Sequence, residues 1–198
     1  ITDDDVADAP LFGELADRIR GLLQGAILVA HNLAFDLGFL RSELQRAGLY
    51  WPPTRAEIDT LALAQRLMPE LKSHKLEAVC AALGVPLDTA HRACNDAEAC
   101  GRAFVELTRR HGAPTDIEGL IDWAEAIGPP PDTGHLALGA KGVAEFRVGP
   151  HVGKTVEEHP ETLQWMTFAL ERREGRWVSR FPDSVQQWGR RWLRVRGA

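Results

Sequence analysis

The stretch that decides the fold is AILVAHNLAFDLGFL, residues 26–40. It begins with a short continuous apolar run, which is typical of a strand buried on both faces of a sheet. The run ends at the polar pair His31 and Asn32, and a helix is predicted over residues 33–48 with Asp36 in its first turn. Open α/β sheets bind ligands at the carboxyl ends of such strands. This stretch therefore predicts an α/β domain with a ligand site directly after the strand.

A second segment, AHRACNDA, covers residues 90–97. His91 precedes a helix predicted over residues 93–110 and Asp96 lies one turn inside it, so both side chains are expected to point into one cleft. Carboxylate oxygens are the ligands that Mg²⁺ and Mn²⁺ prefer, and a histidine that titrates near neutrality can accept a proton from water. Taken singly, each residue is more often structural, since an aspartate in a first helical turn favours the helix dipole.

The remaining elements up to residue 127 alternate between helices and one more strand. Helices are predicted over residues 10–23, 61–67, 75–83 and 115–127, and a strand is predicted over residues 56–59. The inward faces of the first two helices are expected to carry Leu11, Leu15, Ile19, Leu22 and Leu23, and Phe35, Phe39, Leu40 and Leu44. Two strands do not make an independent sheet, so this number of strands is too small for the fold.

Two patterns resemble the second and third motifs of DEDDh-type 3′–5′ exonucleases, the family of the bacterial DNA polymerase III epsilon (proofreading) subunit. They are H-N-x-x-F-D-x-x-F-L, starting at His31, and H-x-A-x-x-D-A, starting at His91. Segments beginning at Ile58 and His74 are also similar to that family, and the resemblance covers about residues 1–112. It implies a ribonuclease-H-like fold in which four acidic residues hold two divalent metal ions, Mg²⁺ or Mn²⁺.

The resemblance also implies roles for individual residues. The metal ligands would be Asp36 and Asp96, the general base would be His91, and the nucleotide pocket would be shaped by His31, Asn32 and Phe35. The implied reaction is two-metal hydrolysis that releases nucleoside 5′-monophosphates from DNA 3′ ends, in proofreading or repair. Two alternatives stay open: an RNA-trimming exoribonuclease of the same superfamily, and a non-catalytic relative that binds nucleic acid.

The family's first motif, an Asp-x-Glu on the first strand, has no counterpart in the sequence. The acidic residues 3–5 do not replace it, because no apolar strand precedes them. Ile1 and Thr2 resemble the point at which family members enter the helix after their first three strands. We therefore expect the N-terminal strands and the Asp-x-Glu pair upstream of Ile1, and catalysis is conditional on that pair. A naturally shortened, inactive relative is the alternative.

Composition changes after a proline-rich boundary. The run GPPPD at residues 128–132 is expected to end the preceding helix. The predicted organisation is an exonuclease domain over residues 1–127, a Pro/Gly-rich linker over 128–143 and a small, basic, Trp-rich α+β module over 144–198. Residues 135–198 hold 11 Lys or Arg against 7 Asp or Glu, whereas the earlier residues hold 12 against 21. A basic, aromatic surface of this kind suits an anionic polymer.

The C-terminal module is predicted to begin with a strand and glycine turn over residues 145–155 and a helix from Pro160 to about Glu171. This part resembles a module found after exonucleases of the exonuclease X type. Its last helix, over residues 181–196, places four apolar side chains on one face: Val185, Trp188, Trp192 and Val195. Two interpretations of that helix stay open. The tryptophans form a small core with solvated arginines around it, or the helix is a nucleic-acid clamp that combines phosphate contacts with base stacking.

Overall composition restricts the class of protein. The chain has 198 residues, of which 44% are apolar and 26% charged, which is ordinary for a globular protein. Its apolar runs are shorter than the roughly 20 residues that a membrane span needs, and its three cysteines form no disulfide framework. We therefore expect a cytoplasmic protein with no membrane association. The expected partners are nucleic acid, with single-stranded DNA or 3′ ends preferred, and a DNA polymerase subunit.

Overall fold

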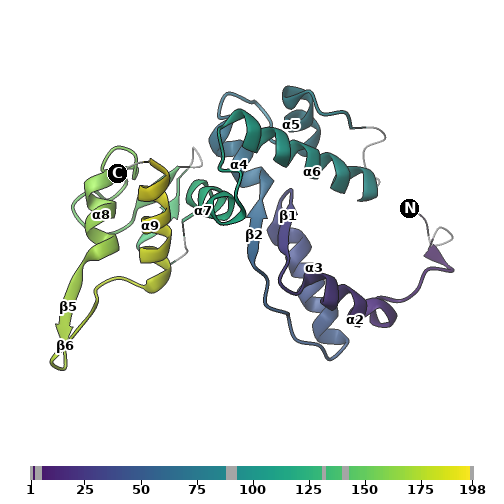
Figure 1. Cartoon of the computed structure of the whole chain (residues 1–198), viewed down its shortest axis with the longest axis horizontal. Helices are drawn as coiled ribbons and strands as arrows, with labels where there is room; N and C mark the ends of the chain where they lie inside the picture. Colours follow the sequence, from purple (N-terminus) through teal and green to yellow (C-terminus); the bar gives the residue numbers. More distant parts are fainter. Residues whose placement is uncertain (1, 3–5, 88–92, 131–132, 140–142, 197–198) are drawn as a thin grey trace.

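The computed structural model describes residues 2, 6–87, 93–130, 133–139 and 143–196. Its helices and strands are α2 (Phe12–Leu23), β1 (Ile27–Ala30), α3 (Leu33–Arg46), β2 (Ala56–Asp59), α4 (Thr60–Leu67), α5 (Leu76–Leu83), α6 (Ala93–Arg110), α7 (Ile117–Ile127), β3 (Leu136–Leu138), β4 (Ala144–Phe146), α8 (Pro160–Phe168), β5 (Leu170–Arg173), β6 (Arg176–Ser179) and α9 (Asp183–Arg196). Figure 1 shows the elements up to α6 on one side of α7 and those after it on the other. The mixed α/β class predicted from the sequence is confirmed.

The two strands of the first part are parallel neighbours. Ile27 pairs with Ala56 and Ala30 pairs with Asp59, so both strands end at the same edge. Parallel strands need a crossover connection, and α3 provides it between them. The strand predicted over residues 56–59 has those bounds in the structure.

The prediction that the first strand is buried on both faces is wrong. All four residues of β1 are half-buried, whereas Ala56 and Ile58 of β2 are buried. Within the residues that the structure describes, β1 is hydrogen-bonded only to β2, so its other edge has no neighbouring strand. A continuous apolar run indicates a strand, but its burial depends on the elements that cover it.

The predicted inward faces of α2 and α3 are also partly wrong. Leu11 and Leu22 are 75% and 71% exposed, and Phe35 and Phe39 are 62% and 61% exposed. Two of the predicted residues, Leu23 and Leu44, are buried in the small core between the helices together with Ala16, and α3 also buries Leu33 and Leu37. Leu11 precedes α2, and Phe35 and Phe39 form a second apolar face of α3 that the contact between the helices leaves uncovered.

A larger core lies among β2, α4, α5, α6 and α7. Its fully buried members include Leu63, Ala64, Val79 and Leu107, and α6 packs against both α5 and β1. The sequence predicted α6 with the bounds it has in the structure. Because α6 crosses β1, its first turns are brought toward the edge where the two parallel strands end.

Helix α7 contributes to both cores of the molecule. Trp123 and Ala124 belong to the core of the first part, and Ala126 belongs to the core of the C-terminal part. Along α9, Arg191 contacts Asp122 at 3.2 Å. A second link joins Arg66 of α4 to Glu157, at 2.6 Å, and the Arg66 side chain is only 8% exposed. The two parts are therefore joined by packing and by ion pairs.

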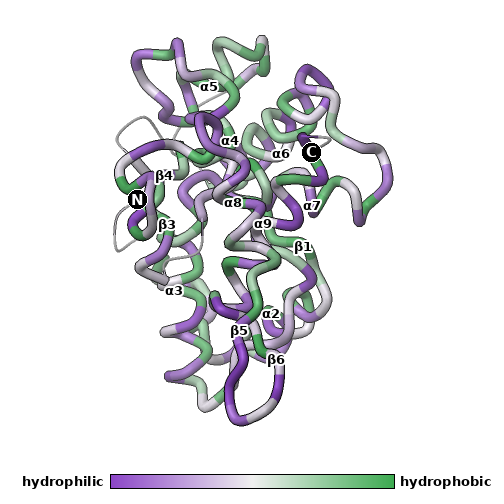
Figure 2. Tube along the Cα trace, turned by 90° about the vertical axis from the view of Figure 1, so that its left-hand side faces the viewer, coloured by the Kyte–Doolittle hydropathy of each residue, from purple (hydrophilic) through white to green (hydrophobic). Residues whose placement is uncertain are grey.

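The C-terminal part contains three strands that the sequence did not predict. Strand β3, which pairs with β4, lies inside the segment predicted as a linker. The helix predicted to reach residue 171 ends at Phe168, and β5 and β6 then form an antiparallel hairpin. Glu174 and Gly175 have φ angles of 50° and 79°, which are the positive values that a tight two-residue hairpin turn requires. Figure 2 shows the hairpin as a narrow, mainly hydrophilic loop at the bottom of the view.

The structure favours the small-core interpretation of the last helix. Val185, Trp188 and Trp192 are buried in the C-terminal core. Arg191 and Arg194 of the same helix form ion pairs with Asp122 of α7. The tryptophans of α9 are therefore packing residues, and two of its arginines are engaged within the protein.

Candidate active site

The candidate site lies where β1 and β2 end. Because the strands are parallel and in register, the residues that follow Ala30 and Asp59 meet at one edge. These residues are His31 and Asn32 after β1 and Thr60 after β2. The carboxyl edge of parallel strands is where open α/β sheets place their ligands. The position predicted for His31 and Asn32 from the sequence is the position that they occupy.

His31 is held by contacts at both ring nitrogens. Its Nε2 lies 2.8 Å from the carbonyl oxygen of His74, to which it donates, and its Nδ1 lies 3.1 Å from Oγ1 of Thr60. Burial lowers the pKa of His31 below 6.5, partly offset by the hydrogen bond to His74 and the charge of Asp59. His31 is therefore a neutral ring in a fixed orientation, suited to shaping a pocket.

Asn32 begins α3 in an unusual backbone conformation. Its φ and ψ angles are 69° and 51°, a left-handed conformation that asparagine adopts more readily than most residues. Its backbone N–H donates to Oδ1 of Asp59 at 2.9 Å, and the same oxygen accepts from the backbone N–H of Leu61, also at 2.9 Å. Asp59 thus fixes the starts of α3 and α4 together.

Asp59 was not among the candidate site residues predicted from the sequence. The segment around Ile58 was noted only as a secondary likeness, and an aspartate before a helix is commonly a cap. The sequence did contain an indication that Asp59 belongs to the site. Asp59 is the last residue of the second predicted strand, and His31 directly follows the first. Residues at both strand ends are expected to share a site.

The predicted metal ligand Asp36 lies on α3 one turn after Asn32, and its side chain is exposed. The neighbouring Phe35 is also exposed and contacts Phe39 edge to face, with ring centroids 4.9 Å apart. Asp36 is therefore open to an ion and a substrate. Phe35, predicted to shape the nucleotide pocket, presents an aromatic surface beside it.

The second predicted metal ligand, Asp96, is half-buried in the first turn of α6. One turn later on the same helix, Cys100 lies 3.5 Å from Oγ1 of Thr60. The pKa of Cys100 is raised mainly by burial, and also by the negative charges of Asp59 and Asp36. These charges therefore lie within electrostatic range of the part of α6 that follows Asp96. The predicted general base, His91, lies outside the described residues.

A groove of about 450 Å³ adjoins this edge. Its lining includes His31, Asn32, Lys72, Ser73 and Lys75. Both lysines are exposed. Ammonium groups in such a groove can bind phosphate oxygens.

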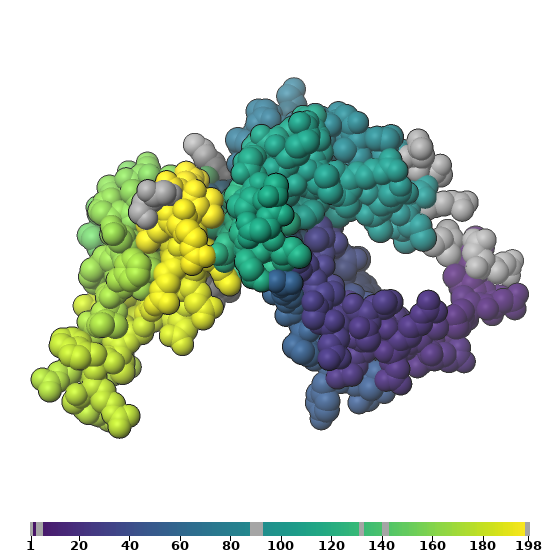
Figure 3. Space-filling model, in the orientation of Figure 1, coloured from purple at the N-terminus to yellow at the C-terminus, as the bar shows by residue number. Residues whose placement is uncertain are grey.

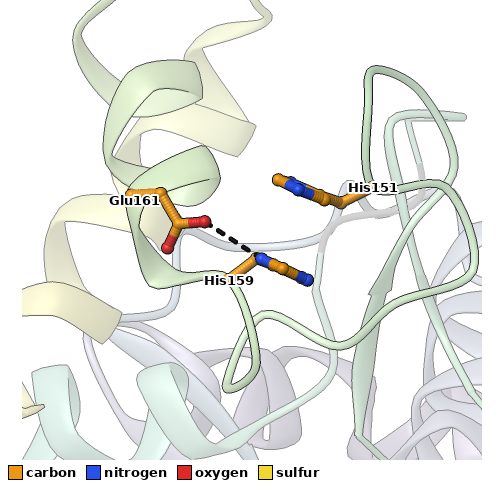
Figure 4. A group of neighbouring side chains, drawn as sticks. All are labelled: His151, His159 and Glu161. Carbon is orange, nitrogen blue, oxygen red and sulfur yellow. Dashed lines mark hydrogen bonds and ion pairs between the residues drawn. The ribbon is translucent and has the colours of Figure 1, made fainter.

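Only one group of three metal-ligating side chains is found in the described part of the chain, and it lies elsewhere. His151, His159 and Glu161 come together in the C-terminal part, as Figure 4 shows. Asp36 and Asp96 belong to no such group among the residues described. The two predicted ligands are carboxylates, the donor type that suits Mg²⁺ and Mn²⁺.

The strand ends, the half-buried His31 and the aspartates in the first turns of α3 and α6 define an α/β domain with a polar ligand site at its carboxyl edge. The chain belongs to the RNase T exonuclease family, whose sequence profile, described as exonuclease, matches residues 1–104. The family-level prediction from the two motifs is confirmed.

Several curated proteins are similar to about half of the chain. The PolC-type DNA polymerase III of Oceanobacillus iheyensis is 42% identical over 110 residues, which are 56% of this chain and 8% of that protein. The PolC-type DNA polymerase III of Bacillus cereus is 39% identical over 109 residues, 55% of this chain and 8% of that protein. The 3′-5′ exonuclease DinG of Staphylococcus epidermidis is 34% identical over 106 residues, 54% of this chain and 12% of that protein. The chain therefore matches only a small part of each relative.

No helix in the described part of the chain combines the length and the apolar composition that crossing a bilayer requires.

Proposed function

We propose that this chain carries the catalytic domain of a metal-dependent 3′–5′ exonuclease that acts on DNA in proofreading or repair. The observation that carries the proposal is the strand edge at which His31, Asn32 and Asp59 are held together, with Asp36 one turn away. Membership of the exonuclease family supports this activity. The relatives described as DNA polymerase III and as a 3′-5′ exonuclease favour DNA as substrate and the 3′ end as the site of attack.

The carboxylates at this edge fit divalent metal ions by their donor chemistry. We assign Asp36 and Asp96 as the ligands, because they stand at the aspartate positions of the two motif segments and neither is fully buried. Asp59 fixes the starts of two helices at the same edge. When bound, two such ions would supply a water activated for attack and balance the charge on the leaving oxygen.

The other site residues are assigned roles from the motif at His91 and from the positions of His31 and Phe35. We assign His91 as the general base that accepts the proton of the attacking water, a task for which a neutral imidazole is suited. His31, held at both nitrogens, keeps Asn32 and the start of α3 in place. Phe35, exposed beside Asp36, offers a face on which the terminal base can stack.

The polarity of degradation tests the proposed function. The full-length protein is incubated with single-stranded DNA and RNA of one sequence, labelled at the 5′ or the 3′ end. With Mg²⁺ or Mn²⁺, we expect a ladder of shortened products from 5′-labelled DNA and early release of labelled mononucleotide from 3′-labelled DNA. EDTA should abolish both. Faster digestion of RNA would favour the exoribonuclease alternative, and binding without cleavage would favour the non-catalytic one.

The C-terminal module (residues 144–198) is proposed to hold the substrate strand through its hairpin. Figure 3 shows β5 and β6 projecting from the body of the molecule at the lower left. The hairpin carries four exposed arginines and a tryptophan that is 69% exposed: Arg172, Arg173, Arg176, Arg180 and Trp177. Arg172 and Trp177 are directly paired across the hairpin. Cationic groups beside an exposed aromatic ring suit single-stranded nucleic acid.

Binding of single-stranded DNA in EDTA, measured by fluorescence anisotropy over a range of salt concentrations, tests the hairpin. The double variant Arg172→Ala/Arg176→Ala should weaken binding and flatten the salt dependence by about 0.7 for each phosphate that is no longer neutralised. Trp177→Ala should weaken binding by roughly 5- to 100-fold while leaving the slope unchanged. Arg18→Ala, an exposed arginine of α2, is the control. Unchanged affinity in both hairpin variants would show that the hairpin does not bind DNA.

A further inference from the structure

The C-terminal part brings together three side chains that commonly bind metals and that the exonuclease reaction does not use. His151 lies in the turn after β4, His159 immediately precedes α8, and Glu161 lies in the first turn of α8. One donor atom from each of the three lies within 4.8 Å of the others. Figure 4 shows the two imidazole rings above one another, with the carboxylate of Glu161 beside His159.

The two imidazole rings are stacked. Their centroids are 3.6 Å apart and their planes differ by 5°. Their ring nitrogens and the carboxylate of Glu161 therefore gather in one place. A nitrogen lone pair from each ring and a carboxylate oxygen are donors that a cation can share.

Each histidine is already oriented by a hydrogen bond. Nδ1 of His151 lies 2.7 Å from Oγ1 of Thr162, and Nδ1 of His159 lies 3.0 Å from Oε1 of Glu161. A contact of this kind with a residue outside the ligand set orients a metal-binding histidine, as Thr162 does for His151. Thr162 itself is buried, at 6% exposure. The ring of His151 is therefore held by the protein before any ion binds.

The backbone around the cluster is also fixed. The N–H of Lys154 donates to the carbonyl of His151 at 3.0 Å, and the N–H of Gly153 donates to the carbonyl of Phe146 at 2.9 Å. On the other side, Leu163 and Met166 anchor α8 in the C-terminal core with no exposed surface. Little conformational freedom would be lost on binding, which favours affinity.

We propose that His151, His159 and Glu161 bind a transition-metal ion of the zinc type, at a site separate from the carboxylates of the exonuclease edge. Imidazole donors suit zinc, whereas magnesium prefers oxygen ligands. Two histidines with one carboxylate form a known zinc ligand set that leaves a fourth position for water. Ligand atoms around a tetrahedral zinc ion are about 3.4 Å apart, so the His159 ring would rotate out of the stack and exchange its hydrogen bond with Glu161 for the ion. The ion would tie the turn after β4 to α8.

Zinc binding by the full chain tests the proposal, measured by competition with a chromophoric chelator. The wild-type protein should bind one more zinc ion than His151→Asn or His159→Asn, whose affinity at this site should fall at least 100-fold. Glu161→Gln should weaken binding by about 10- to 100-fold. His111→Asn, which changes an exposed histidine of the first part, is the control and should retain the ion. The difference in zinc stoichiometry between the wild type and each histidine variant reports this site alone, because any ion bound by the exonuclease carboxylates is common to both proteins.

Two further measurements complete the test. Co²⁺ should give the visible absorption of a tetrahedral ion in the wild type and lose it in His159→Asn. Zinc should raise the thermal midpoint of the wild type but not that of the histidine variants, whose midpoints in EDTA show whether they are folded. Because Glu161 is exposed, Glu161→Gln keeps the test valid if a histidine variant unfolds. Equal zinc stoichiometry in all variants, or displacement of the ion by millimolar Mg²⁺, would overturn the proposal.

Discussion

Replacing Asp36 by Asn in the full-length protein is expected to lower kcat for removal of 3′-terminal nucleotides by about 10³-fold or more. Asn has nearly the same size as Asp but lacks the negative charge that would hold a divalent ion beside the scissile phosphate. Asp36 is exposed, so the substitution should leave the unfolding midpoint almost unchanged. Asp96→Asn should have a similar effect on kcat, and His91→Ala should lower kcat with little effect on KM. Initial rates on 5′-labelled single-stranded DNA measure each effect.

The matched control is Asp17→Asn, which removes an exposed carboxylate from α2. Its kcat should stay within roughly twofold of the wild type, because a surface charge far from the reacting groups is largely screened. Binding of DNA in EDTA should persist in Asp36→Asn, which separates loss of catalysis from loss of substrate. Turnover of Asp36→Asn or Asp96→Asn within tenfold of the wild type would refute the assigned metal-binding role.

Gly189→Ala is expected to destabilise the protein by about 2 kcal/mol, in the range found for overpacked cores. Gly189 lies where α9 crosses α8, and a Cβ atom added to it would lie 2.1 Å from Oγ1 of Thr167. Thr167 cannot move away easily, because it is fully buried and donates to the carbonyl of Leu163 at 2.7 Å. The two helices would have to separate. Denaturant unfolding of the full chain, followed by tryptophan fluorescence, measures the change.

Gly101→Ala makes the same chemical change in a different environment. Gly101 lies on the exposed side of α6, and a Cβ atom added to it would meet no atom within 4 Å. The substitution should therefore stabilise the protein by about 1 kcal/mol through helix propensity. The double variant Gly189→Ala/Thr167→Ala should recover part of the loss, because it removes the atom in conflict. If Gly189→Ala also proved stabilising, the close approach of α8 and α9 would be wrong.

Element type was predictable from the sequence where the local signal was strong. Helix α6 and strand β2 have the predicted bounds, because a long amphipathic period and a short apolar run beside a helix start are local properties. The β5–β6 hairpin was missed, because its strands have only four residues each and no regular alternation of apolar and polar side chains. Such strands are specified by the turn at Gly175 and by the pairing of residues across it. The order of apolar and polar residues along the chain indicates them only weakly.

The placement of His31 and Asn32 at a strand end was predicted from the sequence, whereas the part played by Asp59 was not. His31 and Asn32 follow an apolar run, a pattern that indicates the carboxyl edge of a sheet. The role of Asp59 depends on its register opposite Ala30 and on hydrogen bonds to two backbone groups. The cluster of His151, His159 and Glu161 depends on a turn that folds back onto α8. Neither arrangement is visible before strand pairing and chain reversal are known.

The amino-acid sequence alone determined the family, the mixed α/β class and the two motif segments, because periodicity and spacing are carried by neighbouring residues. Only the tertiary structure decided which apolar stripes are buried. Phe35 and Phe39 of α3 face solvent, whereas Trp188 and Trp192 of α9 lie in a core. Helical periodicity marks every apolar stripe alike, but burial follows from the surface that packs against the stripe. That surface comes from residues distant in the chain, and its position is set by the fold as a whole.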